Sequence, residues 1–174
     1  MPQPGLVQVY TGEGKGKTTA AIGLAVRALG QGLRVLLVRF LKPADPPSGE
    51  ILFLAGVPNL EILTAGLGIL GGRPDAEAVT DSVERTFAAA RARLLSGEVD
   101  LAIFDEANNA LHHGYLNLDE FLALLEERPG HVEIVATGRH APRQLLERAD
   151  LVTRMELVHH PLAAGIAARR GIEF

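Results

Sequence analysis

A short glycine-rich segment near the start of the chain, GEGKGKT at positions 12–18, most constrains how this sequence can fold. An apolar run at 6–10 precedes it and an alanine-rich run at 20–26 follows it, which predicts a strand, a tight loop and a helix. Glycine allows the sharp turns that aim successive backbone N–H groups at an anion, and the following helix adds its positive dipole end. The segment therefore predicts a phosphate-binding loop at the end of a strand.

The loop departs by one residue from the usual spacing G-x-x-x-x-G-K-[ST]. That spacing would require glycine at position 11, where this chain has Thr11, so the loop is one residue tighter. We expect Lys17 to reach the terminal phosphates of a nucleotide and the Thr18 hydroxyl to bind a magnesium ion. The alternative is a glycine-rich turn that binds nothing. The candidate nucleotide-binding residues are Gly12, Glu13, Gly14, Lys15, Gly16, Lys17, Thr18 and Thr19.

A second candidate follows the apolar run at 101–104, which reads as a buried strand ending in Asp105 and Glu106. Carboxylates at such a strand end supply the magnesium side of P-loop nucleotide sites, directly or through water. In an ATPase, Glu106 would instead orient the attacking water. The alternative is helix capping by either carboxylate ahead of a turn at 108–111. We take Thr18, Asp105 and Glu106 as candidate metal ligands, and Lys17, Thr18 and Glu106 as candidate catalytic residues.

Strand and helix patterns alternate along the rest of the chain. Strands are expected at 34–40, 59–63, 132–136 and 151–155, with the one at 59–63 at a sheet edge. Helices are expected at 50–55, at 118–127 and at 142–148, and a long helix from Asp75 or Asp81 to about 95. A proline-rich loop is expected at 42–49. The inward stripe of the long helix is expected to be Val79, Val83, Phe87, Ala90 and Leu94.

This alternation predicts one domain over residues 1–174, with an α/β three-layer fold of the P-loop NTPase (RecA-like) type and a mainly parallel central sheet. Ligands bind such sheets at the carboxyl ends of the strands. The segments 11–18, 105–106 and 137–139 are all expected at that edge.

Composition narrows the class of function. The 174 residues carry a formal net charge of −4 and no cysteine. No global basic field recruits nucleic acid, and a disulfide framework, a Cys-based zinc site and a thiol nucleophile are excluded. No apolar run approaches the ~18–20 residues of a membrane span, and the N-terminus has no signal pattern. We therefore expect a soluble, cytoplasmic protein that binds neither nucleic acid nor membrane.

Two arginines and two histidine pairs are further candidates. Arg139 follows the strand at 132–136, so it lies at the expected ligand-binding edge. Arg27 comes nine residues after Thr18 on the first helix, where the alternative is an ordinary solvated residue. We include both arginines as candidate nucleotide-binding residues. The pairs at 112–113 and 159–160 do not favour a metal site, because adjacent side chains diverge on a helix or a strand.

Taken together, these residues resemble the P-loop ATP:corrinoid adenosyltransferases, or cob(I)yrinic acid a,c-diamide adenosyltransferases, over nearly the whole chain. The shortened loop GEGKGKTTAA at 12–21 is similar to the loop of that family. The order and spacing of further short matches carry the rest of the resemblance: RALG at 27–30, VRFLK at 38–42, FDE at 104–106, RP at 128–129, TGR at 137–139, ADLVT at 149–153, GI-x-A at 165–168 and GIEF at 171–174.

The resemblance implies a reaction and its partners. The Co(I) centre of a reduced corrinoid attacks ribose C5′ of ATP, takes the 5′-deoxyadenosyl group and displaces the triphosphate, in adenosylcobalamin biosynthesis or salvage. It further implies Mg²⁺ as cofactor, cobalamin, cobinamide or cobyrinic acid a,c-diamide as the corrinoid, an electron donor for Co(II), and a homodimer. Lys17 and magnesium would stabilise the leaving triphosphate, and Glu106 would be a magnesium ligand. The alternatives are a RecA-like ATPase and a nucleotide-dependent binding module.

The chain departs from the family pattern in three places. Arg39 stands where the family usually has glutamine, and the pair at 159–160 stands where it has Lys-His. The segment GLGILG at 66–71 lacks the aromatic residues of the family's Gly-x-Gly-Phe-x-Trp loop, which help to close the lower face of the corrinoid. We expect the loop at 66–72 to be mobile in the free protein and to order over the corrinoid, with Ile69 and Leu70 as apolar cover.

Overall fold

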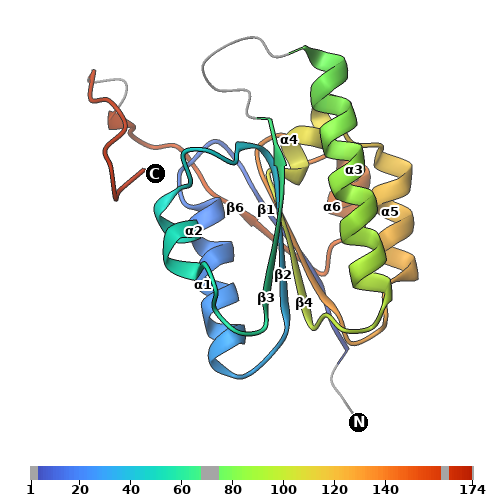
Figure 1. Cartoon of the computed structure of the whole chain (residues 1–174). Helices are drawn as coiled ribbons and strands as arrows, with labels where there is room; N and C mark the ends of the chain where they lie inside the picture. The colour runs from blue at the N-terminus through green and yellow to red at the C-terminus, as the bar shows by residue number, and fades with distance from the viewer. Residues whose placement is uncertain (1–3, 68–74, 162–164, 174) are drawn as a thin grey trace.

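The computed structural model of the chain describes residues 4–67, 75–161 and 165–173. Its strands form one six-stranded sheet in the order β3-β2-β4-β5-β1-β6, in which all neighbours run parallel (Figure 1). The strands are β1 (Val7–Thr11), β2 (Val35–Pro43), β3 (Leu60–Gly66), β4 (Leu101–Asp105), β5 (Glu133–Thr137) and β6 (Leu151–Arg154). The helices are α1 (Lys17–Gly30), α2 (Gly49–Leu54), α3 (Ala76–Leu95), α4 (Ala107–His112), α5 (Leu118–Glu127) and α6 (Arg143–Arg148). The predicted parallel α/β sheet is confirmed.

Helices cover both faces of this sheet, which gives the predicted three layers (Figure 1). On one face α1 contributes Ala21 and Ala25 to a core with Leu37 of β2. On the other face α3, α4, α5 and α6 build a larger core around Phe104 of β4. The Phe104 ring meets Phe121 of α5 edge to face, with centroids 5.3 Å apart. Successive strand residues therefore face opposite cores, as buried parallel strands require.

The long helix α3 begins where one of two predicted caps places it. The Asp75 carboxylate accepts a hydrogen bond from the Glu77 backbone N–H at 3.2 Å, so the helix starts after Asp75 rather than at Asp81. All five residues of the predicted inward stripe are buried. The sequence predicted only a turn where α4 forms, because six residues are too few to show a helical period.

The second strand is longer than its pattern predicted. β2 continues to Pro43, whereas the expected strand ended at Phe40, and its register against β3 shifts between Arg39 and Pro43. Leu41 lies in the left-handed region with φ +54°, which breaks the ladder without ending it. Lys42, expected in a loop, therefore projects from the irregular carboxyl end of a strand. The predicted edge strand at 59–63 is confirmed, since β3 is the last strand on its side of the sheet.

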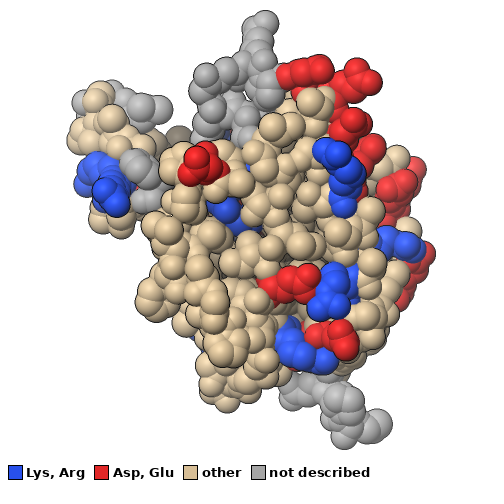
Figure 2. Space-filling view, in the orientation of Figure 1, with Lys and Arg blue, Asp and Glu red and all other residues tan. Residues whose placement is uncertain are grey.

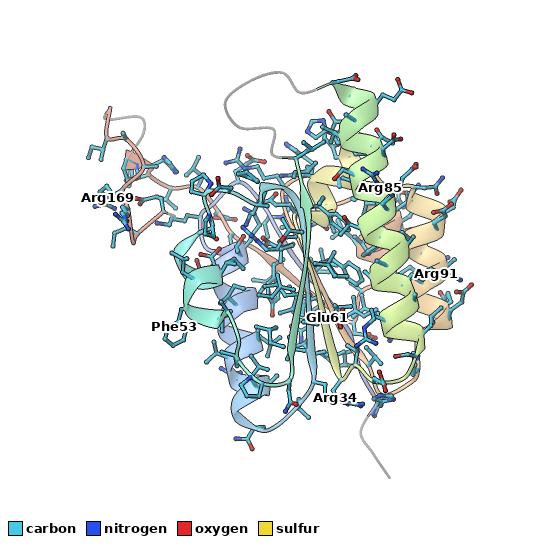
Figure 3. All side chains as sticks on the ribbon, viewed as in Figure 1. Arg34, Phe53, Glu61, Arg85, Arg91 and Arg169 are labelled. Carbon is cyan, nitrogen blue, oxygen red and sulfur yellow. The ribbon has the colours of Figure 1, made fainter. Side chains whose placement is uncertain are left out.

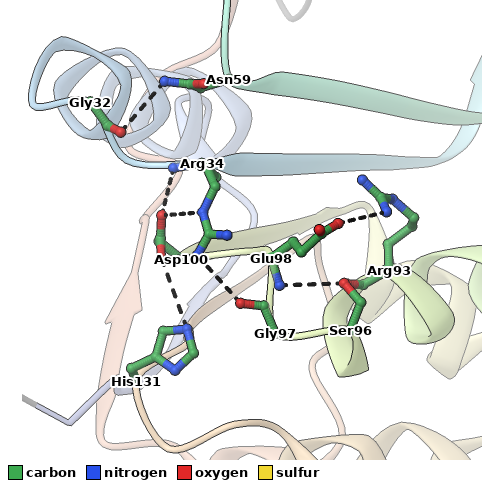
Figure 4. Close-up of polar contacts among 9 residues, drawn as sticks. All are labelled: Gly32, Arg34, Asn59, Arg93, Ser96, Gly97, Glu98, Asp100 and His131. Carbon is green, nitrogen blue, oxygen red and sulfur yellow. Dashed lines mark hydrogen bonds and ion pairs between the residues drawn. The ribbon is translucent and has the colours of Figure 1, made fainter.

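A polar network closes the amino ends of β2 and β4 (Figure 4). Asp100 accepts hydrogen bonds from the Arg34 backbone N–H at 2.8 Å, from its Nε at 3.0 Å and from its Nη2 at 2.8 Å. His131 Nε2 lies 3.9 Å from the same carboxylate. These contacts hold the pKa of Asp100 at about 2, chiefly through the side-chain hydrogen bond with Arg34.

Charged side chains are unevenly distributed over the surface. On the face shown in Figure 2, acidic groups gather at the amino end of α3, both signs of charge occur farther down this side, and the side formed by α1 and α2 is nearly uncharged. Arg85 and Arg91 of α3 point outward, and Phe53 projects from α2 with 78% of its surface exposed (Figure 3). This face shows no continuous basic stripe of the kind that follows a polynucleotide. Within the described parts of the chain, no helix has the length and apolar character to span a bilayer.

Candidate functional site

The glycine-rich loop connects β1 to α1 and is held by the segment that follows β6. Gly14 N–H donates to the Met155 carbonyl at 2.8 Å, and Met155 N–H donates to the Thr11 carbonyl at 2.8 Å. A Cβ on Gly12 would lie 2.4 Å from the Met155 carbonyl oxygen, and one on Gly14 would lie 2.5 Å from that of Glu156. These two glycines are therefore required by close packing, and Gly12 also by its φ of +96°.

Lys17 is the first residue of α1, and its ammonium group lies inside this loop. Its Nζ donates to the carbonyls of Gly12 at 2.6 Å and Gly14 at 2.7 Å, so the ammonium is held inside the turn. Burial lowers the pKa of Lys17, and the positive charge of Arg139 lowers it further. The group is thus placed where an anion bound by the loop would meet it.

Asp105 lies beneath the loop and joins three elements. Its Oδ1 accepts from Thr18 Oγ1 of α1 at 2.8 Å and from Thr137 Oγ1 of β5 at 2.7 Å. Its Oδ2 forms a short ion pair with Lys42 Nζ at the end of β2. The residue is 1% exposed. Parallel register explains the convergence, because Asp105 is paired with Arg39 of β2 at the carboxyl ends of the strands.

Glu106 follows directly and has a strained backbone, with φ +63°. It occupies the N-cap position of α4, but its side chain makes no capping hydrogen bond. Instead its Oε2 accepts from Asn109 Nδ2 at 2.5 Å. Burial raises the pKa of Glu106, as does the charge of Asp105, while nearby Lys42 and Lys17 oppose the rise. Neither carboxylate acts as the helix cap that was the alternative interpretation.

A pocket of about 710 Å³ opens at this edge of the sheet. Most predicted nucleotide-site residues line it: Glu13, Gly14, Lys15, Gly16, Lys17, Thr18, Thr19, Glu106 and Arg139. Gly12 and Asp105 lie behind this lining, in contact with Lys17 and Thr18 respectively. Arg27 is not brought to the pocket; it is exposed in the last turn of α1, about 14 Å along the helix from Thr18 at 1.5 Å per residue. Its role stays a prediction.

Arg139 and its neighbour contact the loop from the end of β5. Arg139 Nε lies 3.4 Å from Glu13 Oε2, and His140 Nε2 lies 3.8 Å from Glu13 Oε1. The rings of His112 and His140 are 4.6 Å apart. Among the described side chains, no group of three or more histidine, cysteine or acidic residues is arranged to hold a metal ion. A metal ion at this site would therefore need a side-chain hydroxyl and the phosphate oxygens of a bound nucleotide in addition to carboxylates.

Three oxygen-bearing side chains offer such a set. Thr18 supplies a hydroxyl, and Asp105 and Glu106 supply carboxylates, all at the floor or wall of one pocket. Hard oxygen donors suit Mg²⁺, which is usually held by one or two carboxylates together with substrate phosphates. The donor chemistry fits that ion.

Several contributors to the site were not assigned by sequence reasoning. Lys42 and Asn109 line the pocket, and Thr137 binds Asp105 beneath it. The C-terminal segment also reaches it: Lys15 Nζ donates to the Ile172 carbonyl at 3.1 Å and pairs with Glu173 Oε1 at 3.0 Å. Lys42 was expected in a loop, and the VRFLK match at 38–42 included it without giving it a role. The loop predicted at 66–72 lies outside the described residues beyond position 67.

Nearly the whole chain is similar to one family of known proteins. The model of a family described as ATP:corrinoid adenosyltransferase BtuR/CobO/CobP matches residues 3–174. The chain is 38% identical over 170 residues to a corrinoid adenosyltransferase of Pseudomonas aeruginosa, covering 98% of this chain and 84% of that protein. It is 35% identical over 170 residues to the corrinoid adenosyltransferase CobA of Salmonella typhimurium, covering 98% and 86%.

Among solved structures, the flagellar accessory protein FlaH from Methanocaldococcus jannaschii is similar in fold. The TM-score is 0.59 at 17% sequence identity, over 88% of this chain and 72% of that one. Identity at this level bears on the fold alone. The similarity in fold is consistent with the RecA-like architecture predicted from the sequence.

Proposed function

This chain belongs to the ATP:corrinoid adenosyltransferase family, and we propose that its reaction takes place in the pocket beside the glycine-rich loop. The enzyme transfers the adenosyl group of ATP to a corrinoid in cobalamin biosynthesis. One observation carries the proposed site: Lys17, Thr18 and Glu106 line a single pocket at the carboxyl ends of parallel strands, with Asp105 bound to Thr18 beneath it.

The proposed step is a displacement at carbon. The Co(I) centre of the corrinoid substrate donates its electron pair to ribose C5′, and the C5′–O bond breaks as the Co–C bond forms. The electrons of the broken bond leave with the triphosphate. The Lys17 ammonium is held by the loop carbonyls of Gly12 and Gly14 before the reaction, so it can stabilise the charge that develops on the leaving oxygens with little reorganisation.

We propose Mg²⁺ as the cofactor, held by Thr18, Asp105 and Glu106. When bound, the ion would neutralise phosphate charge as a Lewis acid. Glu106 then has no proton to remove, because the Co(I) nucleophile carries none. Its contact with Asn109 fixes the carboxylate beside Asp105, which supports a ligand role. In a RecA-like ATPase the same carboxylate would orient water, and the two chemistries release different products.

Product analysis tests this proposal. The protein is incubated with MgATP, with and without a chemically reduced corrinoid, and the phosphate products are separated by ion exchange. We expect tripolyphosphate, formed only when the corrinoid is present. ADP with free phosphate in both reactions would support the ATPase, and unchanged ATP would support a binding module.

The remaining partners are proposed from the family resemblance. The corrinoid would be cobalamin, cobinamide or cobyrinic acid a,c-diamide, and an electron donor would supply the Co(I) state. Two copies of the chain would form a homodimer, which light scattering can check. Because ATP and a reduced corrinoid are both substrates, we place the reaction in the cytoplasm. Ile69 and Leu70 stay the predicted apolar cover of the corrinoid.

A further inference from the structure

The ammonium group of Lys42 lies where two candidate magnesium ligands meet. Its Nζ donates to Thr18 Oγ1 at 3.1 Å and forms a short ion pair with Asp105 Oδ2. Thr18 Oγ1 in turn donates to the other carboxylate oxygen, Asp105 Oδ1, at 2.8 Å. A single cationic side chain therefore bridges the hydroxyl and the carboxylate assigned above to the metal.

The burial of Asp105 explains why a cation is needed there. Its side chain is 2% exposed, and a buried carboxylate without a partner is strongly unfavourable. Thr137 offers only a neutral hydroxyl, and the described hydrogen bond of Arg39 goes to Ser48 Oγ at 3.3 Å. Among the described residues, Lys42 is the one that forms an ion pair with Asp105. Its removal therefore leaves a charge that another cation can compensate.

Resting on the function proposed above, we propose that Lys42 holds the place of Mg²⁺ in the nucleotide-free enzyme and moves onto the triphosphate when MgATP binds. Mg²⁺ and the Lys42 ammonium cannot bind the same oxygens at once. Mg²⁺ binds oxygen at about 2.0–2.1 Å, and an ammonium bound to the same oxygens would lie close enough to be repelled by the ion. A divalent ion held by Thr18 and Asp105 would keep the carboxylate paired, and Lys42 would then be released.

The backbone of β2 gives Lys42 room to make this exchange. Leu41 has φ +54°, and the register shift between Arg39 and Pro43 takes Lys42 out of the regular ladder. The Lys42 side chain is 21% exposed and lines the pocket together with Lys17. Its flexible four-carbon stem lets the ammonium swing toward a bound triphosphate, where a second lysine would further stabilise the leaving group.

The first test measures divalent-ion binding in the absence of nucleotide, with Mn²⁺ as a paramagnetic probe. In the wild type, Mn²⁺ must displace an ammonium; in Lys42→Met it meets a carboxylate that has lost its ion pair and keeps only the charge of the neighbouring Arg39. We expect Lys42→Met to bind Mn²⁺ at least about tenfold more tightly, equal to about 1.4 kcal/mol. Equal affinities in the two proteins would overturn the proposal.

Lys15→Met is the matched control. Lys15 also lines the pocket, but its described contacts are Glu173 and the Ile172 carbonyl rather than Asp105. Its loss removes the same charge from the same pocket, so Mn²⁺ affinity without nucleotide should stay at the wild-type value. A tenfold gain in this variant as well would attribute the effect to net charge and overturn the specific role of Lys42.

Loss of Lys42 can also be followed through stability if the variant does not fold in metal-free buffer. Thermal melts are then recorded with and without millimolar Mn²⁺, and on the double variant Lys42→Met with Asp105→Asn. Recovery of a cooperative melt by Mn²⁺ in the single variant, and by the second substitution without Mn²⁺, supports the proposal. A melt that neither change restores contradicts it.

A separate arm measures transfer. Lys42→Met should slow tripolyphosphate release by on the order of 10²-fold, comparable to the loss of one preorganised oxyanion partner. An unchanged rate would overturn the movement of Lys42 onto the triphosphate. If the wild type releases tripolyphosphate while Lys42→Met has the same Mn²⁺ affinity as the wild type, only this inference fails. If the wild type releases none, the proposed function fails whatever the Mn²⁺ titration gives.

Discussion

Two polar networks lie at opposite ends of the same sheet, and they are built in opposite ways. At the amino ends, the Arg34 guanidinium grips Asp100 with both side-chain nitrogens, at 3.0 and 2.8 Å. At the carboxyl ends, Asp105 is bound by the flexible side chain of Lys42 and by the hydroxyls of Thr18 and Thr137. Arg34 is 44% exposed, whereas the Asp105 side chain is 2% exposed.

The difference separates a contact that holds the fold from a contact that can be exchanged. A guanidinium fork matches a carboxylate in one geometry, while a lysine is a point charge that another cation can replace. Backbone strain is concentrated at the carboxyl ends. Leu41, Glu106 and His140 have φ of +54°, +63° and +53° where chain segments leave the sheet around the pocket. At the amino ends Asn59 has φ +64°, but asparagine adopts this conformation more readily than those residue types. Such residues cost of order 1–3 kcal/mol each and gather at functional sites.

The largest expected effect on activity comes from comparing a cationic residue at the carboxyl ends of the strands with one at their amino ends. Lys17→Ala should lower the rate of adenosyl transfer by about 10²–10³, because it removes a preorganised charge from the triphosphate site. Arg34→Ala should leave that rate within about twofold while lowering the melting temperature, since its contacts are all at the far end of the sheet. Steady-state kinetics and thermal melts on both variants make the comparison. Near-normal transfer by Lys17→Ala would refute the site.

A smaller effect is expected at Glu106. Glu106→Gln weakens a proposed metal ligand, so transfer at low magnesium should fall by about 10–100-fold and recover in part as magnesium is raised. The measurement is the magnesium dependence of the rate for both proteins. Failure of magnesium to rescue, together with phosphate release by the wild type without corrinoid, would favour a water-activating base.

The smallest effect concerns Asp100. Its pKa of about 2 lies below the ordinary value of 3.8, so its contribution to stability is present above about pH 4 and is lost as the pH falls toward 2. Because the pair is partly exposed, we expect about 1 kcal/mol, or roughly 2–4 °C in Tm, for Asp100→Asn at pH 7. The difference from the wild type should shrink below about pH 4 and be mostly lost near pH 2.

Thermal melts across that pH range check the result at Asp100. Glu84→Gln serves as a control, because Glu84 is an exposed carboxylate of α3 without an ion pair among the described residues. Its Tm should match the wild type at every pH. A difference for Asp100→Asn that persists to pH 2 would mean that packing, rather than charge, is lost.

Local patterns predicted most of the fold because each depends on residues near one another in sequence. Alternating polar and apolar residues at 59–63 indicated an edge strand, and β3 is one. The apolar stripe of α3 and the cap at Asp75 followed from helical spacing. The shortened loop and the carboxylates after β4 were placed at one edge by the rule for parallel sheets, and the structure brings them together.

What the sequence missed depends on contacts between distant segments. Lys42 was assigned to a loop, because the apolar run ends at Leu41 and prolines follow. Its contact with Asp105 spans 63 residues and requires that β2 and β4 be neighbours in register. The contact between Lys15 and Glu173 spans 158 residues. Periodicity gives the face of a strand but not its neighbours, so neither partner was predictable.

The position of β1 has a consequence for how the chain is made. β1 lies between β5 and β6, and the Val7 N–H donates to the Asp150 carboxylate at 2.8 Å, 143 residues later. During synthesis, β1 is translated before every other strand of this sheet and has no sheet neighbour until β5 and β6 follow. The phosphate loop is therefore translated before the strands that frame it. A chain interrupted before β5 would lack the strands that frame the loop, so nucleotide binding would report that synthesis has reached the end of the sheet.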